Sequence, residues 1–291
     1  MYENKIPEVQ LDVVVIDATN LLHRCHHAKS STLEADLAGN PCWAISGVFN
    51  YTTKLIQKWR PSKFIVAFDI DGCPSRKVLA PDYKAGRNTP APELVDQLKR
   101  APELFRQAGF AVGEVSGWEA DDVCATVAAK AKGNVGIVSS DKDIHQLSSD
   151  NCTVLKPEGI VYTPSALKAK YGVSGPRWVE FAALCGEAAD NLEGVNGIGP
   201  KRAIALLERF DDIEDAFAHP EQVIETVGAS SAAKLQAGVE IFRRNRKVGT
   251  LKTDLSLGTH GYLPTATQVR NALRDLGYQR TINQAEYLLA P

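Results

Sequence analysis

Short apolar runs recur along the first half of the chain, and acidic residues follow each of them. The runs are Val13 to Ile16, Phe64 to Phe68, Phe110 to Val115 and Val135 to Ser139. Such runs are typical of strands buried on both faces of a sheet. Helical spacing of apolar residues in Gly47 to Trp59, and an alanine-rich stretch ending near Lys130, predict helices between the strands. This alternation indicates an α/β fold in which helices flank a mostly parallel sheet.

Two segments interrupt the alternation. Residues 73–108 are rich in lysine and arginine and predict a basic, partly helical excursion. From residue 176 the strand pattern stops, and Arg177 to Cys185 and Lys201 to Phe210 predict helices on either side of a glycine-rich turn. We therefore expect an α/β core over residues 1–175, a helical region over 176–262 and a short helical tail over 263–291.

Composition places the chain among ordinary globular proteins, since 44% of its 291 residues are hydrophobic. No apolar run is long enough to cross a membrane, and the N-terminus has no leader pattern, so we expect a cytoplasmic protein without a membrane span. The six cysteines form no CxxC pair, which favours reduced thiols over a zinc ribbon or a disulfide framework.

Nine acidic residues fall at the predicted strand ends and in two short acidic motifs. They are Asp17, Asp69, Glu119, Asp121, Asp122, Asp141, Asp143, Glu187 and Asp190. In such sheets the ligand site lies beyond the carboxyl ends of the strands. Carboxylates gathered there repel one another unless cations bind between them. A ligand set almost without cysteine or histidine favours Mg²⁺ or Mn²⁺, and two such ions roughly 4 Å apart can hydrolyse a phosphodiester.

The net charge of −2 conceals a difference between the nine acids and the rest of the chain. Setting the nine acids aside leaves 26 of the 35 acids against 33 bases. If metal ions neutralise the acidic cluster, the rest of the molecule is basic enough to attract a polyanion.

Each acidic motif also has a structural interpretation. Asp17 follows a strand and can cap a helix, Asp121 and Asp122 can complement a helix dipole, and residues 141–143 can form a solvated turn. The metal interpretation is favoured because four strand ends carry acids toward one edge. Two further alternatives are weaker: residues 69–72 resemble the DxDG nucleophile loop of haloacid-dehalogenase phosphatases but lie on the second strand, and His23 and His27 share a helix face but have no third zinc ligand nearby.

Two other motifs point to nucleic acid. Residues 194–203 predict a helix-loop-helix in which Gly194, Gly197 and Gly199 permit close backbone approach, with Lys201 and Arg202 beside the amides of the second helix. The pattern GxxGIGxKxA indicates a sequence-independent grip on duplex DNA. Residues 82–87 are either a solvated basic loop or a functional one. In the second case Lys84 and Arg87 reach the scissile phosphate and Tyr83 stacks on an unpaired base.

Seven motifs, in this order, make the chain similar to the bacterial and bacteriophage 5′-nuclease (flap endonuclease) family, which includes the N-terminal nuclease domain of bacterial DNA polymerase I. They are VVVIDATNLLHR, FDIDG, YKAGR, EADD, SSDKDIHQL, GEAADN and GVNGIGPKRA. The resemblance implies a PIN-like core, a helical arch at about residues 73–108 and a helix-three-turn-helix element in the helical region. It also implies a metal-dependent nuclease of DNA replication and repair that cuts DNA at a 5′ flap, a nick or a free 5′ end and leaves 5′-phosphates. We expect a monomer.

The resemblance further implies roles for single residues. The first metal ion would be served by Asp17, Asp69, Glu119, Asp121, Asp122 and Asp141, and the second by Asp141, Asp143, Glu187 and Asp190. The bases that contact the reacting phosphate would be Arg24, Lys84 and Arg87, and Tyr83 would be the aromatic at the base of the arch. The hairpin loop would bind K⁺ through its carbonyls.

One position departs from the family pattern. The family usually has Gly-Asp-x-x-Asp where this chain has Gly186-Glu-Ala-Ala-Asp190, so we expect a shifted second site that prefers Mn²⁺. Three functions are open: the nuclease, a catalytically weak DNA-junction binding module of the same fold, and the phosphatase. The nuclease is favoured because every expected acid position holds a carboxylate. The sequence ends at Pro291 without a polymerase segment, so we expect a nuclease that acts alone.

Overall fold

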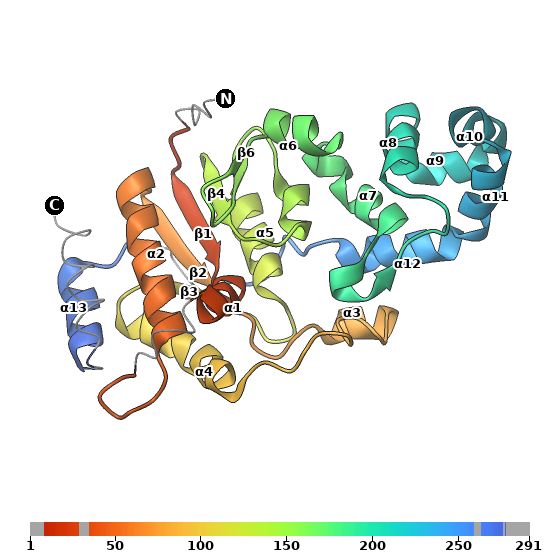
Figure 1. Cartoon of the computed structure of the whole chain (residues 1–291). Helices are drawn as coiled ribbons and strands as arrows, with labels where there is room; N and C mark the ends of the chain where they lie inside the picture. Colours follow the sequence, from red (N-terminus) through yellow and green to blue (C-terminus); the bar gives the residue numbers. More distant parts are fainter. Residues whose placement is uncertain (1–8, 29–34, 259–262, 276, 278–291) are drawn as a thin grey trace.

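A six-stranded sheet lies between layers of helices, and a second group of helices extends from one end of it (Figure 1). The computed structural model describes residues 9–28, 35–258, 263–275 and 277. The strands are β1 (Val13–Asp17), β2 (Lys63–Ala67), β3 (Ala111–Gly113), β4 (Val135–Val138), β5 (Cys152–Leu155) and β6 (Val161–Tyr162). Their order is β3-β2-β1-β4-β5-β6, and only β6 is antiparallel to its neighbour. The prediction of a mostly parallel α/β sheet is confirmed.

Helices follow most of the strands. In the α/β part they are α1 (Ala18–Ala28), α2 (Trp43–Trp59), α3 (Pro74–Leu79), α4 (Pro92–Gln107), α5 (Ala120–Lys130) and α6 (Pro164–Tyr171), with the 3-10 helix η1 (Asp143–Leu147). The second group comprises η2 (Gly175–Arg177), α7 (Trp178–Cys185), η3 (Ala188–Asp190), α8 (Pro200–Arg209), α9 (Ile213–Ala218), α10 (Pro220–Val227), α11 (Ala229–Ala237) and α12 (Val239–Gly249). A two-stranded ribbon of β7 (Gly186–Glu187) and β8 (Leu192–Glu193) lies within it, and α13 (Ala266–Asp275) follows it. Among the described helices, none is both long and apolar enough to span a bilayer.

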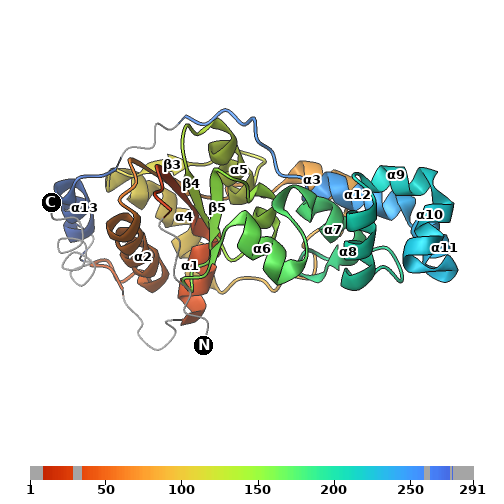
Figure 2. The same cartoon turned by 90° about the horizontal axis from the view of Figure 1, so that it is seen from above.

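The strands bury side chains on both faces, which explains their uninterrupted apolar runs. Val14 and Ile16 of β1 pack with α1, α2 and α4 into one core, whereas Val13 and Val15 pack with α5 into another. Figure 2 shows α2 and α5 on opposite sides of the sheet. Each of these buried aliphatic side chains stabilises the fold by roughly 1.5–3 kcal/mol.

The register of the parallel strands brings their carboxyl ends level with one another. Asp17, the last residue of β1, pairs with Ala67 of β2, and Ile16 pairs with Val138 of β4. The chain therefore leaves three central strands at the same edge of the sheet. This is the edge at which the acidic motifs begin.

The structure adds three details to the expected organisation. Within the predicted arch at residues 73–108, α4 buries Leu94, Ala101 and Phe105 in the core beneath α2. The second group of helices ends with α12, and the chain after it returns and buries Leu251 and Leu255 against α5. The predicted tail is helical, but α13 packs onto α4 as part of the α/β unit. Residues 278–291 of that tail lie outside the described residues.

Candidate active site

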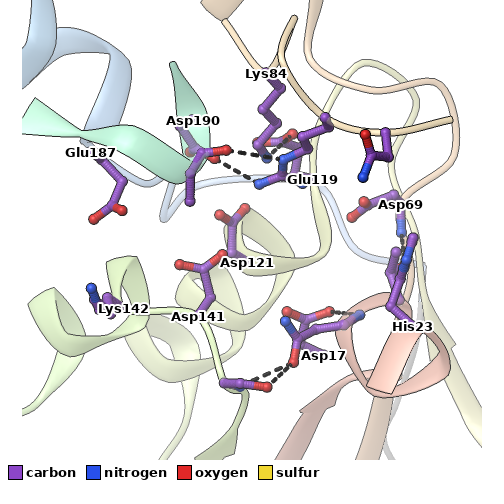
Figure 3. Close-up of a pocket in the computed structure, with 16 residues that line it drawn as sticks. Asp17, His23, Asp69, Lys84, Glu119, Asp121, Asp141, Lys142, Glu187 and Asp190 are labelled. Carbon is purple, nitrogen blue, oxygen red and sulfur yellow. Dashed lines mark hydrogen bonds and ion pairs between the residues drawn. The ribbon is translucent and has the colours of Figure 1, made fainter. Parts of the chain in front are cut away.

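Seven of the nine predicted acids line one cleft of about 580 Å³ at the carboxyl edge of the sheet (Figure 3). These are Asp17, Asp69, Glu119, Asp121, Asp141, Glu187 and Asp190. The first five come from the ends of β1, β2 and β4 and from the start of α5, and the last two come from the β7–β8 ribbon and η3. The fold thus gathers acids that lie as far apart as residues 17 and 190 in the sequence.

Burial and mutual repulsion make this anionic cleft unfavourable unless a cation binds. Burial, together with the charges of Asp69 and Asp141, raises the pKa of Asp17 to about 7. Burial also raises the pKa of Asp69 and, more strongly, that of Asp121. The ligand atoms are carboxylate oxygens, which hard divalent ions such as Mg²⁺ and Mn²⁺ prefer. A buried set of repelling oxygen donors therefore fits a divalent metal.

Asp143 lies just behind this cleft, at the start of η1. It lines a small cavity of about 20 Å³, and Glu187 lines both this cavity and the cleft. Burial and the charges of Asp141, Asp190 and Glu187 raise the pKa of Asp143 well above its usual value. The four acids predicted for the second metal ion are therefore close enough to repel one another.

Asp122 differs from the other acids because its carboxylate oxygens already accept several hydrogen bonds from other groups of the protein. The side chain is fully buried and accepts hydrogen bonds from Nη1 and Nη2 of Arg76, each at 2.8 Å. It also accepts the backbone N–H groups of Glu119 and Lys252. The Glu119 contact completes a capping box at the start of α5. These contacts make Asp122 a structural anchor, although its oxygen lies within 4.8 Å of those of Glu119 and Asp121.

Two predicted bases, Lys84 and Arg87, line the cleft. Lys84 Nζ lies 2.5 Å from Glu119 Oε1, and Arg87 Nη2 lies 2.6 Å from Asp190 Oδ1. Burial lowers the pKa of Lys84, but the carboxylates of Glu119, Asp190 and Asp121 outweigh burial and raise that pKa overall. Lys84 has a left-handed backbone with φ of 60°, and its backbone N–H donates a hydrogen bond to the Asp190 carbonyl at 2.9 Å. A non-glycine residue in this conformation is strained, which is common where a side chain must be aimed at a site.

The structure corrects the predicted role of Tyr83. Its side chain is only 5% exposed and packs against Ala80, Val248 and Leu192, so it has no free face for stacking on a base. Its hydroxyl instead donates a hydrogen bond to Glu119 Oε2 at 3.1 Å. Tyr83 therefore orients a cleft carboxylate from behind.

Arg24 does not line the cleft. It lies on the exposed side of α1, where its guanidinium is 3.7 Å from the carboxylate of Glu158. Contact with a phosphate in the cleft would require its side chain to move, so the predicted role remains a prediction.

The first turns of α1 supply cleft residues that the sequence analysis missed. Thr19 Oγ1 accepts the Asp69 amide at 2.9 Å, and Asn20 Oδ1 accepts the Ser140 hydroxyl at 2.5 Å, so α1 clamps the loops after β2 and β4. His23 lines the cleft one turn further on, and burial lowers its pKa. Its i, i+3 relation to Asn20 was the available signal. Within the described residues, the one group of three or more candidate ligands is Glu119, Asp121 and Asp122, which gives the zinc interpretation of the histidines no support.

The glycine loop, residues 194–199, joins β8 to α8 directly beyond the acidic ribbon. Gly186 and Gly194 face each other so closely that a β-carbon on either would collide with the backbone of the other. Gly197 has φ of 72°, and its carbonyl accepts Arg202 Nη1 at 2.9 Å. Lys201 and Arg202 are exposed at the start of α8, and Lys234 of α11 lies beside Gly197. A basic surface therefore surrounds the hairpin, while K⁺ binding there stays a prediction.

Two family descriptions match the chain. Residues 12–172 match the family described as 5′-3′ exonuclease, N-terminal resolvase-like domain, and residues 173–268 match 5′-3′ exonuclease, C-terminal SAM fold. The chain is 35% identical over 248 residues to a thermostable DNA polymerase I of Thermus thermophilus and 31% identical over 254 residues to DNA polymerase I of Bacillus subtilis. These matches cover 84% and 83% of this chain but only 29% and 28% of the relatives, so the chain spans under a third of their length.

Solved structures share the fold at low sequence identity. The T5 D15 protein, crystallised with metal ions, has a TM-score of 0.70 at 21% identity, with 95% of this chain and 98% of that one covered. The catalytic core of Rad2 in complex with a DNA substrate has a TM-score of 0.61 at 15% identity, with 97% and 94% covered. Both parts of the chain, the sheet and the helical region, are included in these matches.

Proposed function

Because the chain belongs to the 5′-3′ exonuclease family, we propose that it is a structure-specific 5′ nuclease. It hydrolyses DNA phosphodiesters at a 5′ flap, a nick or a free 5′ end with two divalent ions and leaves 5′-phosphates, in DNA replication or repair. We expect it to act as a monomer. Because the chain belongs to this family, we set aside the haloacid-dehalogenase-like phosphatase, in which the nucleophile loop would follow the first strand.

The cleft of seven carboxylates is the observation that carries this proposal. Asp17, Asp69, Glu119, Asp121 and Asp141 would hold one ion, and Asp141, Asp143, Glu187 and Asp190 a second. Bound divalent ions supply Lewis-acid activation of water and of the phosphate. Asp122, whose oxygens already accept bonds from Arg76 and two amides, supports Glu119 from behind.

Lys84 and Arg87 would bind the reacting phosphate. Each faces the cleft and uses only part of its donor capacity on Glu119 or Asp190. An ammonium has three N–H donors and a guanidinium five, so protons remain for phosphate oxygens. Their positive charge offsets the charge that builds up on the phosphate during hydrolysis. His23, at the other end of the cleft, would orient the strand as a neutral group.

The hairpin would hold the duplex next to the scissile bond. Its exposed cations, Lys201 and Arg202, lie at the start of α8, whose first turn has no side-chain cap on its backbone amides. Glu187 and Asp190 lie only a few residues before it in the same segment. A duplex held at the hairpin is therefore fixed in position relative to the acids.

The proposal is tested with a labelled 5′-flap duplex, with and without EDTA, in Mg²⁺ and in Mn²⁺. We expect metal-dependent release of the flap and a product that DNA ligase can seal, because sealing requires a 5′-phosphate. Asp141→Asn should abolish release while binding to the flap duplex survives. Binding without cutting by the wild type would identify the junction-binding module instead. Full turnover by Asp141→Asn would contradict the site assignment.

A further inference from the structure

Lys156 is a buried cation just outside the acidic cleft. It follows the last residue of β5, and only 7% of it is exposed. Among the described residues its ammonium forms no ion pair, and its hydrogen bond goes to the main-chain carbonyl of Asp141, at 2.8 Å. Lys156 does not line the cleft itself, and none of the roles proposed above uses it.

The charge of Lys156 is costly where it lies. A buried ammonium loses its hydration, and a contact with one carbonyl replaces only part of it. Burial lowers the pKa of Lys156 to about 8, although the carboxylates of Asp141 and Glu158 favour the charged form. Glu158, two residues further along, directs its carboxylate to Arg24 on the surface of α1. The lysine therefore has no close ionic partner that would account for its burial, which leaves the carbonyl contact to explain it.

The carbonyl that Lys156 binds belongs to a segment that other hydrogen bonds also fix. The backbone N–H of Asp141 donates to Ser139 Oγ at 3.0 Å, and this hydroxyl donates to Asp17 Oδ2 at 2.9 Å. Asp141 Oδ1 accepts the backbone N–H of Asp143 at 3.0 Å. The amide, the carboxylate and the carbonyl of Asp141 are thus each held by a neighbour, and Lys156 supplies the contact to the carbonyl.

The position of Asp141 affects the whole proposed metal site. Asp141 is the one acid assigned to both divalent ions, and in Figure 3 its side chain lies between those of Glu187 and Asp17. It lies after β4 and before η1, so neither a strand nor a helix fixes its backbone. Groups that orient a metal ligand without binding the metal typically change metal affinity by about 10–100-fold when they are removed.

We propose that Lys156 is a positioning residue of the nuclease, which holds the Asp141 carbonyl and thereby fixes the carboxylate that both divalent ions share. This inference rests on the proposed function, in which Asp141 binds both ions. It predicts the sign of an effect. Removal of a positive charge near a cation site would by itself tighten cation binding. Removal of a group that orients a ligand weakens it.

The test measures Mn²⁺ binding by isothermal titration calorimetry without DNA, so that no turnover contributes to the result. Lys156→Met keeps most of the length of the side chain and removes its charge and its donor. We expect the dissociation constant for Mn²⁺ to rise about tenfold, the low end of the effect typical of such groups. Binding is measured well below the Tm of each protein, and Lys156→Leu provides the same comparison if Lys156→Met does not fold.

A matched variant removes a lysine that makes the same kind of contact elsewhere. Lys130, the last residue of α5, donates to the main-chain carbonyl of Leu255, and it lies roughly 14 Å along the helix from Asp121. Lys130→Met should therefore leave Mn²⁺ binding unchanged. In a protein that already carries Asp141→Asn, Lys156→Met should weaken Mn²⁺ binding much less than it does alone, because the carboxylate through which it acts is gone.

The outcomes separate the positioning role from the proposed function. An unchanged or tighter affinity for Mn²⁺ in Lys156→Met would overturn the positioning role. An equal loss in Lys130→Met, or an equal loss with and without Asp141→Asn, would overturn it as well. If the wild type binds no Mn²⁺, or if Asp141→Asn binds it as tightly as the wild type does, the proposed metal site itself is contradicted.

Discussion

Asp121 and Asp122 are neighbours on the first turn of α5, but the carboxylate of Asp121 lines the cleft and that of Asp122 binds Arg76. Asp121 faces the cleft, where burial raises its pKa, so its charge is unfavourable in the folded protein without metal. Asp122 faces away from the cleft and binds Arg76. We predict that Asp122→Asn strongly destabilises the protein, whereas Asp121→Asn leaves stability in EDTA unchanged or higher and abolishes cleavage.

The size of the Asp122 effect follows from its contacts. Arg76 is 5% exposed, and loss of one partner of a buried ion pair typically costs about 3–5 kcal/mol. Glu119 Oε2 still lies 2.6 Å from Arg76 Nη1, which places the effect toward the lower end of that range. At roughly 2–4 °C per kcal/mol for a protein of this size, Tm should fall by about 6–12 °C.

The assay is thermal unfolding of the wild type and both variants in EDTA, followed by circular dichroism. Flap cleavage is then measured well below every Tm. The two variants make the same chemical change at adjacent positions, so each is the control for the other. A Tm of Asp122→Asn within 2 °C of the wild type, or an equal fall for Asp121→Asn, would refute the division of roles.

Three further predictions concern the cleft. The pKa of Asp17 is raised to about 7 in the folded protein, so the ionised carboxylate destabilises the fold fully above that pH. This destabilisation decreases as the pH falls from about 7 toward the pKa of Asp17 in the unfolded protein. Between pH 8 and 5.5 in EDTA, the stability of the wild type relative to Asp17→Asn should therefore rise by about 2 kcal/mol; a constant difference would contradict this. Glu187→Asp should change the ratio of Mg²⁺ to Mn²⁺ activity, and an unchanged ratio would count against a shifted second site. Lys84→Ala should lower kcat more than flap affinity, measured by single-turnover kinetics and fluorescence anisotropy; an equal loss in both would make Lys84 a general DNA contact.

Patterns that depend on near neighbours in the sequence predicted the fold well. The apolar runs located β1, β2, β3 and β4 to within about two residues at each end, because strands buried on both faces must be apolar throughout. The strands β5 and β6 were missed, since β5 contains the polar Thr153 and β6 has only two residues, so neither gives a continuous apolar run. The core face of α4 was overlooked although Leu94, Ala101 and Phe105 recur at helical spacing, because the lysines and arginines on its other positions dominated the interpretation.

The same distinction applies to the candidate site: local sequence patterns predicted part of it, and contacts between distant segments determine the rest. Acids at the ends of parallel strands could be placed together because sheet topology brings those ends to one edge. The separate roles of Asp121 and Asp122 depend on Arg76, which lies on α3 far away in the sequence. The burial of Tyr83 likewise depends on Val248 and Leu192. Contacts between distant segments of this kind leave no local pattern, so an exposed aromatic and a buried one look the same in the sequence.

The end of α12 links the helical region to the acidic cleft at several points. Val248 O accepts Arg76 Nε at 2.9 Å, and Gly249 O accepts Gln146 Nε2 at 3.0 Å, on the 3-10 helix that begins at Asp143. The amide of Lys252 donates to Asp122, and α12 packs along α7, which leads into Glu187. Misplacing reacting groups by about 1 Å can slow a reaction on the order of a hundredfold. If the hairpin holds the duplex as proposed, these links would let a sequence-independent grip select the bond to be cut, because the helical region is attached to α3, α5 and η1, which carry or support the acids.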